Sequence, residues 1–403
     1  MRAYERLLKY VRTDSTSDED NASATPSTPR QHELAKLLEA EMMELGMEDV
    51  HRDGHCYVYG KLPASPGFGA SPTIGLIAHI DTAPDFSGEN VKPRIVENYQ
   101  GGDIELGHGR RITTEKFPDL TEHIGQDIIV TDGSTLLGAD DKAGIAEILT
   151  ACERLINEHI PHCAVSVCFC PDEEIGHGAE LMDLRRLGAD FAYTLDGGAV
   201  EELSYETFNA CSAVWEIQGV NVHPGSAKDI MVNASLVAME INSLLPPEEI
   251  PAKTEGYQGF FHLTDMKGNC EKAELKYIVR DHDAGSFRAR QELLGQIEKR
   301  MKEKYGPDSV KLSITQQYKN MAEVLRDKQD IVLRAERALK KQGLTPDIRP
   351  IRGGTDGSQL SFRGLPCPNL GTGGYGFHGP YEHISTAHMD TMVEVVLNLL
   401  GEK

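Results

Sequence analysis

Histidine and carboxylate side chains stand at the ends of three apolar runs in this chain. His79 and Asp81 close the run IGLIAHID, three acids at 172–174 follow AVSVCFCP, and Asp196 follows FAYTL. Such continuous apolar runs are typical of parallel strands that are buried on both faces. Because the carboxyl ends of parallel strands meet at one edge of a sheet, we expect these side chains to lie near one another there.

Two further positions offer the same types of ligand. Asp140 lies in LGADDKAG, just before a predicted helix at 142–155, and His378 lies in the glycine-rich segment GTGGYGFHG. Each position alone has an ordinary explanation, since Asp residues cap helices and acidic turns are commonly just solvated. Together, the positions supply His, Asp, Glu, Asp and His, which is enough for two metal ions that share one carboxylate.

The spacing within these segments suits metal chemistry. Side chains two apart on a strand point the same way, so Asp81 can accept the second ring N–H of His79 and fix the ring's orientation. The adjacent acids at 172–174 repel one another unless metal ions or arginines compensate their charge. Neighbouring carboxylates also suit a divided task, in which one binds the metal and the other transfers protons.

The elements around these residues predict an α/β fold. The apolar runs alternate with the helix at 142–155, which favours a mixed, largely parallel sheet flanked by helices. Between 208 and 322 the pattern changes to two helices and about four strands, as in a ferredoxin-like α+β unit. We therefore predict a catalytic domain at 1–207 and 323–403, and an inserted lid or dimerisation domain at 208–322.

Finer elements follow from local signals. A helix is expected with Thr28 as its cap and Gln31 completing a capping box. Another helix is expected over 227–245. The long polar stretch 91–131 lacks clear periodicity, so it should hold a functional loop or short strands. After a helix at 328–342, the chain is expected to end in a glycine-rich tail.

Composition narrows the class of partners. The 403 residues include 63 acidic and 41 basic side chains, a formal net charge of −22, so nucleic acid and anionic membrane surfaces are not expected partners. No apolar run reaches the roughly 18 residues of a membrane span, and the charged N-terminus is unlike a signal peptide. Eight cysteines without a C-x-x-C pair favour reduced thiols and a cytoplasmic location.

The chemistry-bearing segments resemble the co-catalytic zinc peptidase family that includes glutamate carboxypeptidase. The similarity runs almost from end to end of the chain. The segments that carry it are HIDTAPDFSGENVKPRIVENYQGGDIELG, TLLGADDKAGIAEI, PDEEIGHGA, YTLDGG, NVHPGSAKDIMVNA and RGGTDGSQLSFRGLPCPNLGTGGYGFHG.

The resemblance implies a centre of two zinc ions. The Asp140 carboxylate would bind both ions. His79 and Asp196 would complete the ligands of one ion, and Glu174 and His378 those of the other. Cobalt or manganese could take the same ligands. His383 is an additional histidine nearby, and the ligand set is complete without it.

The resemblance also implies roles for residues beside the metals. Asp81 would orient the first histidine, and Glu173 would be the general base that takes a proton from a metal-bridged water. His223 would stabilise the tetrahedral oxyanion, acting in its own subunit or in a partner's. Arg280 and Arg352 would bind substrate, one of them holding a peptide carboxylate through a two-pronged contact.

The activity implied is that of an exopeptidase that removes the N-terminal residue from tripeptides. A dipeptidase, a carboxypeptidase or an N-acyl amino-acid deacylase of the same family is the alternative, because the group that recognises the free amino end is not identifiable. A metal-binding protein without catalysis is disfavoured, since Glu173 and His223 are both present. The inserted domain would close over a short peptide, or pair two chains in a homodimer.

Overall fold

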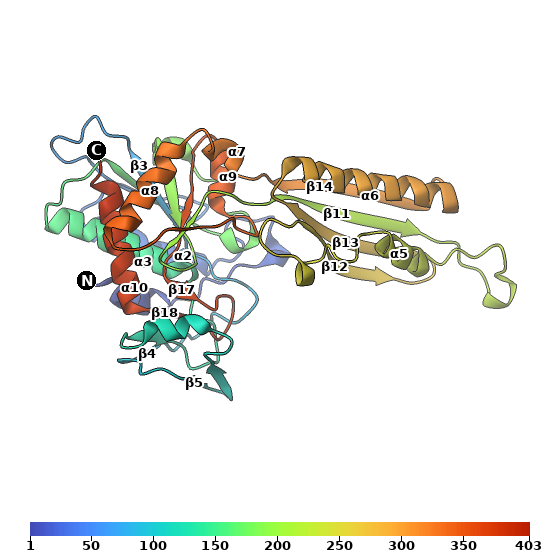
Figure 1. Cartoon of the computed structure of the whole chain (residues 1–403), viewed down its shortest axis with the longest axis horizontal. Coiled ribbons are helices and arrows are strands. Elements are labelled where there is room, and N and C mark those ends of the chain that lie inside the picture. Colours follow the sequence, from blue (N-terminus) through green and yellow to red (C-terminus); the bar gives the residue numbers. More distant parts are fainter. The chain divides into compact units, whose positions relative to one another are not determined.

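The computed structural model describes residues 1–403 and contains two compact units (Figure 1). The first comprises Met1–Tyr205, Met321–Arg349 and Thr355–Lys403, and the second comprises Glu206–Asn320 and Pro350–Gly354. The segment 350–354, which the sequence prediction assigns to the catalytic domain, belongs to the second unit. There Phe208 N donates to the Gly353 carbonyl (3.3 Å), and Ile351 N donates to Glu206 O (2.9 Å).

An eight-stranded mixed sheet forms the centre of the first unit. Its middle strands are parallel: β8 (Val165–Cys170), β3 (Ile74–His79), β9 (Phe191–Leu195) and β16 (Asn369–Leu370). The outer strands are β1 (Glu48–Arg52) and β2 (Val58–Leu62) at one edge, and β10 (Glu202–Ser204) and β15 (Asp347–Ile348) at the other. Every residue of β3, β8 and β9 is buried, which explains their continuous apolar sequences. The predicted α/β class is confirmed.

Helices cover both faces of this sheet (Figure 1). On β3, Leu76 packs in the apolar cluster that includes α3, whereas the next residue, Ile77, packs with α4 and α9. The helices of the unit are α1 (Ala3–Tyr10), α2 (Gln31–Glu44), α3 (Ala139–Asn157), α4 (Leu184–Leu187), α7 (Ala322–Leu325), α8 (Gln329–Lys341), α9 (Asp356–Phe362) and α10 (Thr386–Leu400). None of the helices combines the length and apolar character that crossing a membrane requires.

The polar stretch 91–131 folds into short strands, one of the two outcomes predicted for it. β4 (Arg94–Val96) and β7 (Ile128–Val130) join β17 (Gly374–Tyr375) and β18 (His383–Ser385) in a four-stranded sheet. Between β4 and β7 in sequence lie a hairpin of β5 (Ile104–Gly107) and β6 (Arg110–Ile112) and the 3-10 helix η2 (Pro118–His123). Their apolar residues form a separate small core that includes Leu120 and Ile128.

The second unit is a ferredoxin-like α+β fold, as predicted. Its elements follow the order strand, helix, strand, strand, helix, strand: β11 (Asn209–Gln218), α5 (Ala234–Ser243), β12 (Phe260–Gly268), β13 (Lys272–Asp281), α6 (Ala284–Tyr305) and β14 (Val310–Tyr318). The sheet order β12-β13-β11-β14 is antiparallel throughout. The fully buried Trp215 on β11 packs with apolar residues of α5 and α6.

Three local predictions are wrong. Helix α2 begins at Gln31 without a side-chain cap, because the Thr28 hydroxyl donates to Thr16 O and the Gln31 amide donates to Asp172. Helix α5 is shorter than 227–245, since Asn233 caps it and the preceding residues form turns. The glycine-rich tail is followed by α10, a helix with nine buried residues.

Candidate two-metal centre

His79 ends strand β3 and faces carboxylates with both ring nitrogens. Its Nε2 lies 3.1 Å from Asp140 Oδ1 and 3.6 Å from Asp196 Oδ1. Its Nδ1 lies 3.0 Å from the Asp81 carbonyl oxygen and 3.4 Å from Asp81 Oδ1. With Nδ1–H donated to Asp81, the Nε2 lone pair points at the two carboxylates, which is the orientation a metal-binding histidine adopts.

A second histidine, which lies far from His79 in the sequence, also faces Asp140. His378, in the loop between β17 and β18, places Nε2 3.0 Å from Glu174 Oε2 and 3.5 Å from Asp140 Oδ2. Asp140 therefore turns one carboxylate oxygen to each histidine. The fold brings the five sequence-predicted ligands into two groups that share Asp140, and within each group the ligand atoms lie within 4.8 Å of one another. We call these two groups the two-metal centre.

A glycine on α3 allows Asp140 to approach the end of β9. Asp140 and Asp141 have non-helical backbone angles, so the regular part of α3 starts after them, near the predicted start at Lys142. A Cβ atom at Gly144 would lie 2.3 Å from the Leu195 carbonyl oxygen. Only glycine fits there, and its absence of a side chain lets the helix start beside the strand end that carries Asp196.

The Asp81 carboxylate links the end of strand β3 to the acidic turn that carries Glu173 and Glu174. Its Oδ1 accepts from Glu173 N (3.0 Å), and its Oδ2 accepts from Glu174 N (3.2 Å). The same carboxylate lies beside His79, so it links the end of β3 to the acidic turn after β8. That turn is also held by Asp172, whose carboxylate accepts from the Ser27 backbone and hydroxyl. Glu173 and Glu174 are thus presented from a fixed backbone.

Glu382 positions the shared carboxylate, and the sequence analysis missed it. Its buried carboxylate accepts from the backbone of Leu137 and Gly138 (2.7 Å each) and of Asp140 (2.9 Å). Three N–H groups converging on one carboxylate hold the loop that presents Asp140. The only available signal was an acid four residues after His378, which no spacing rule connects to a loop more than 240 residues earlier.

The carboxylates of the centre create a strongly negative site. Burial and the neighbouring Asp140 raise the pKa of Glu174 to about 7, and burial and Asp196 raise the pKa of Glu173 well above its usual value. Hydrogen bonds to Asp140 and Glu174 raise the pKa of His378 to about 11. Glu174 also has a buried oxygen, Oε1, with no hydrogen-bond partner.

These residues fit divalent cations on physical grounds. Crowded, partly buried carboxylates are unfavourable unless positive charge compensates them. The negative field that holds a proton on His378 would equally favour a cation at the same place. Imidazole nitrogen and carboxylate oxygen are both zinc ligands, and an orphaned carboxylate oxygen offers a further coordination position.

The remaining predicted residues belong to the second unit. Arg280 is buried and donates to the carbonyls of Cys211 (3.2 Å) and Val279 (3.1 Å). Arg352 donates from Nη1 to the carbonyls of Gly256 (2.6 Å) and Gln258 (2.8 Å), and from Nη2 to the carbonyl (3.3 Å) and hydroxyl (2.9 Å) of Thr254. Four of its five N–H donors therefore bond within the unit.

His223 is exposed in the second unit. Its Nδ1 accepts from Gly225 N at 3.1 Å, which leaves Nε2 as the ring's donor. An exposed Nε2–H can donate to a ligand. The oxyanion role of His223 stays a prediction.

Fold and site together define an α/β hydrolytic enzyme whose acids and histidines gather at the carboxyl ends of parallel strands. A model of peptidase family M20/M25/M40 matches residues 132–402. The chain therefore belongs to this peptidase family. It is 52% identical over 400 residues to peptidase T of Clostridium perfringens (strain 13 / Type A), which covers 99% of this chain and 98% of that relative. Peptidase T of Desulfitobacterium hafniense (strain Y51) is 51% identical over 399 residues, or 98% and 97% of the two chains.

Solved structures share the whole fold. The aminopeptidase PepT from Bacillus cereus aligns with a TM-score of 0.78 at 24% identity, over 99% of this chain and 97% of that one. A tripeptidase from Staphylococcus aureus aligns with a TM-score of 0.79 at 21% identity, again over 99% and 97%. At these identities the two structures show the fold.

Proposed function

We propose that the chain is a two-metal aminopeptidase that removes the N-terminal residue from tripeptides. The observation that carries the proposal is the Asp140 carboxylate, which faces His79 with one oxygen and His378 with the other. A carboxylate shared in this way is what a pair of metal ions about 3.5–4 Å apart requires. The substrate class is supported by the 52% identity to a peptidase T.

The ligands divide into two sets. One ion would be held by His79, Asp196 and one oxygen of Asp140, and the other by Glu174, His378 and the second oxygen of Asp140. The mixture of imidazole and carboxylate favours zinc, and cobalt or manganese accept the same ligands. When bound, the pair of ions polarises the scissile carbonyl and lowers the pKa of a water molecule.

Protein side chains carry the proton transfers. Glu173 adjoins the ligand Glu174, and Asp81 holds its backbone N–H at 3.0 Å. From this position the Glu173 carboxylate takes a proton from the attacking water and returns it to the leaving amine. Asp81 orients His79 through Nδ1 and is a positioning residue.

The second unit would supply the groups that recognise the rest of the peptide. His223 would donate Nε2–H to the oxyanion of the tetrahedral intermediate. Arg280 would bind the peptide carboxylate through a two-pronged contact with Nε and Nη2, because its bonds within the unit use only Nη1, whereas Arg352 keeps only Nε–H for a ligand. A unit with this role closes over the substrate and excludes water, and pairing of two chains through it is compatible with that role.

The proposed specificity is tested by comparing three substrates. We expect a free tripeptide to be cut after its first residue, with the matching dipeptide and the N-acetylated tripeptide cut at least tenfold more slowly by kcat/KM. Excess chelator should abolish turnover, and added zinc should restore it, because the ligands hold the ions reversibly. The products are identified by mass spectrometry.

The alternatives give different outcomes in the same assay. Preference for the dipeptide, release of the C-terminal residue, or cleavage of the acetylated substrate would assign a dipeptidase, a carboxypeptidase or a deacylase, respectively.

All eight cysteines are free thiols, which accords with the predicted cytoplasmic location.

A further inference from the structure

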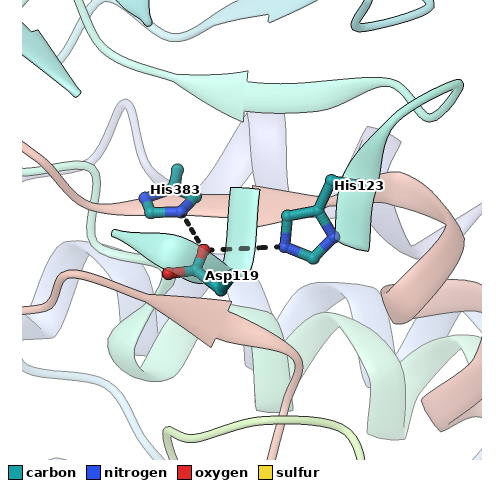
Figure 2. A group of neighbouring side chains, drawn as sticks. All are labelled: Asp119, His123 and His383. Carbon is teal, nitrogen blue, oxygen red and sulfur yellow. Dashed lines mark hydrogen bonds and ion pairs between the residues drawn. The ribbon is translucent and has the colours of Figure 1, made fainter. Parts of the chain in front are cut away.

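A separate group of three potential ligands lies in the first unit and shares no residue with the two-metal centre (Figure 2). Asp119 and His123 lie on η2, and His383 begins β18. One ligand atom from each lies within 4.8 Å of the others. Because Asp119 and His383 are 264 positions apart in sequence, tertiary folding alone brings them together. Asp119 and His123 belong to the polar stretch 91–131. His383 is the additional histidine of the sequence analysis, which is not a candidate ligand of the two-metal centre.

His123 is a buried side chain without a hydrogen-bond partner. It has no exposed surface, and neither ring nitrogen has a hydrogen-bond partner within 3.5 Å. Figure 2 shows the ring directed at Asp119, with Nε2 3.7 Å from Oδ2. Burial lowers the pKa of His123 to about 4, so the ring is neutral near pH 7. A buried imidazole with an unused lone pair is costly in a folded protein unless something binds it.

His383 is oriented as a metal ligand would be. Its Nδ1 lies 2.8 Å from the Tyr381 carbonyl oxygen, which only accepts, so Nδ1 carries a hydrogen. Its Nε2 lies 2.7 Å from Asp119 Oδ2, a carboxylate oxygen. A ring with its hydrogen on Nδ1 alone would face the carboxylate oxygen with a lone pair, so a proton or a cation must lie between Nε2 and Oδ2. A histidine that donates one N–H to a backbone carbonyl commonly binds metal through its other nitrogen.

The surroundings suit a small, dry site. Both histidines have fully buried side chains, whereas the Asp119 side chain is 15% exposed, so one side of the group reaches solvent. Two aromatic rings pack on His383: Phe117 meets it edge-on at 5.7 Å, and Tyr375 stacks on it at 5.8 Å. The His388 ring lies 4.6 Å from the His123 ring. A largely buried group with one open side supplies three protein ligands and leaves a position for water.

We propose that Asp119, His123 and His383 bind a further divalent transition-metal ion of the zinc class, with a structural role. Zinc takes two imidazole nitrogens and a carboxylate oxygen at about 2.0–2.2 Å, which places ligand atoms roughly 3.3 Å apart. That spacing lies between the 2.7 and 3.7 Å found at Asp119. Calcium and magnesium are disfavoured because they select oxygen ligands.

The ion would cross-link two distant parts of the unit. It joins η2, inside the polar stretch, to β18, which begins directly after Glu382. Since Glu382 holds the backbone around Asp140, the cross-link would steady the segment that supports the two-metal centre. The ligand assignment itself does not depend on the proposed aminopeptidase activity.

The test compares His123→Phe with wild type in zinc content and in thermal unfolding. Zinc is counted by mass spectrometry after dialysis against excess zinc and removal of unbound ions. We expect the variant to hold one zinc ion fewer per chain and to have a lower Tm. Without a metal, phenylalanine would merely replace an unpartnered buried imidazole, and Tm would stay the same or rise. Equal zinc content in the two proteins overturns the proposal.

Two further variants keep the result interpretable. His388→Phe is the matched control, because that ring lies 4.6 Å from His123 but outside the ligand group, and it should retain the full zinc content. If His123→Phe does not fold, Asp119→Asn at a part-exposed side chain should lose the same ion. Because the measurement is a difference of one ion, its failure leaves the count at the two-metal centre unaffected.

Discussion

Glu173→Gln is expected to lower kcat by roughly 10⁴-fold while the bound metal stays unchanged. Glutamine keeps the size of the side chain and the backbone contact with Asp81, but it cannot accept a proton from the attacking water. Glu173 is not among the ligand atoms of the two-metal centre, so both ions should remain. Steady-state kinetics on a tripeptide and metal analysis of the same sample measure the two effects.

The matched control for this variant is Glu180→Gln. Glu180 follows in the same segment, but its side chain is 60% exposed and pairs with His177. It should retain wild-type kcat. Normal turnover by Glu173→Gln with both ions bound would remove Glu173 from the mechanism, and loss of metal from it would show that the residue is a ligand.

Asp140→Ala is expected to lose both metal ions and all measurable turnover. Each ion loses one of its three protein ligands, because Asp140 supplies an oxygen to each histidine-containing group. Loss of an outer-shell partner costs about 10–100-fold in metal affinity, and loss of a shared direct ligand should exceed that for both ions. Metal content after dialysis at a fixed free zinc concentration gives the result, with circular dichroism as the check on folding.

Asp85→Ala is the control for the shared ligand. Asp85 lies 3.4 Å from the other nitrogen of His378, but its side chain is 64% exposed and belongs to neither group. It should keep both ions at saturating zinc, because an outer-shell contact contributes less to metal affinity than a shared direct ligand. If Asp140→Ala retained one of these two ions at full occupancy, beyond any ion held by Asp119, His123 and His383, the two ions would not share the Asp140 carboxylate.

Most of the candidate site could be predicted from the sequence, because its candidate ligands stand directly after apolar strands or beside a predicted helix. His79 and Asp196 stand directly at the ends of apolar strands, and parallel strands bring such ends together. Glu382 was inaccessible for the opposite reason. Its role consists of hydrogen bonds to backbone N–H groups of a distant loop, and such contacts leave no pattern in residue type or spacing.

The fold could be predicted where the local sequence pattern matches the burial of the element in the folded chain. Strand β9 has the predicted bounds, since all of its side chains are buried. The capping box at Thr28 failed because the Thr28 hydroxyl donates to Thr16 O and the Gln31 amide group turns to Asp172, which lies 141 positions away in sequence. The strands within 91–131 contain only three or four residues each, too few for alternation to be detected.

The most direct test of the two-metal centre is an anomalous difference map at the zinc absorption edge, from crystals grown with zinc. The account predicts two peaks about 3.5–4 Å apart on either side of the Asp140 carboxylate. One should contact His79 and Asp196, and the other Glu174 and His378. A single peak at full occupancy in this centre, or peaks beside His79 and His378 that do not contact Asp140, would contradict the shared-carboxylate centre on which the proposed function rests, whereas a separate peak at Asp119, His123 and His383 would not.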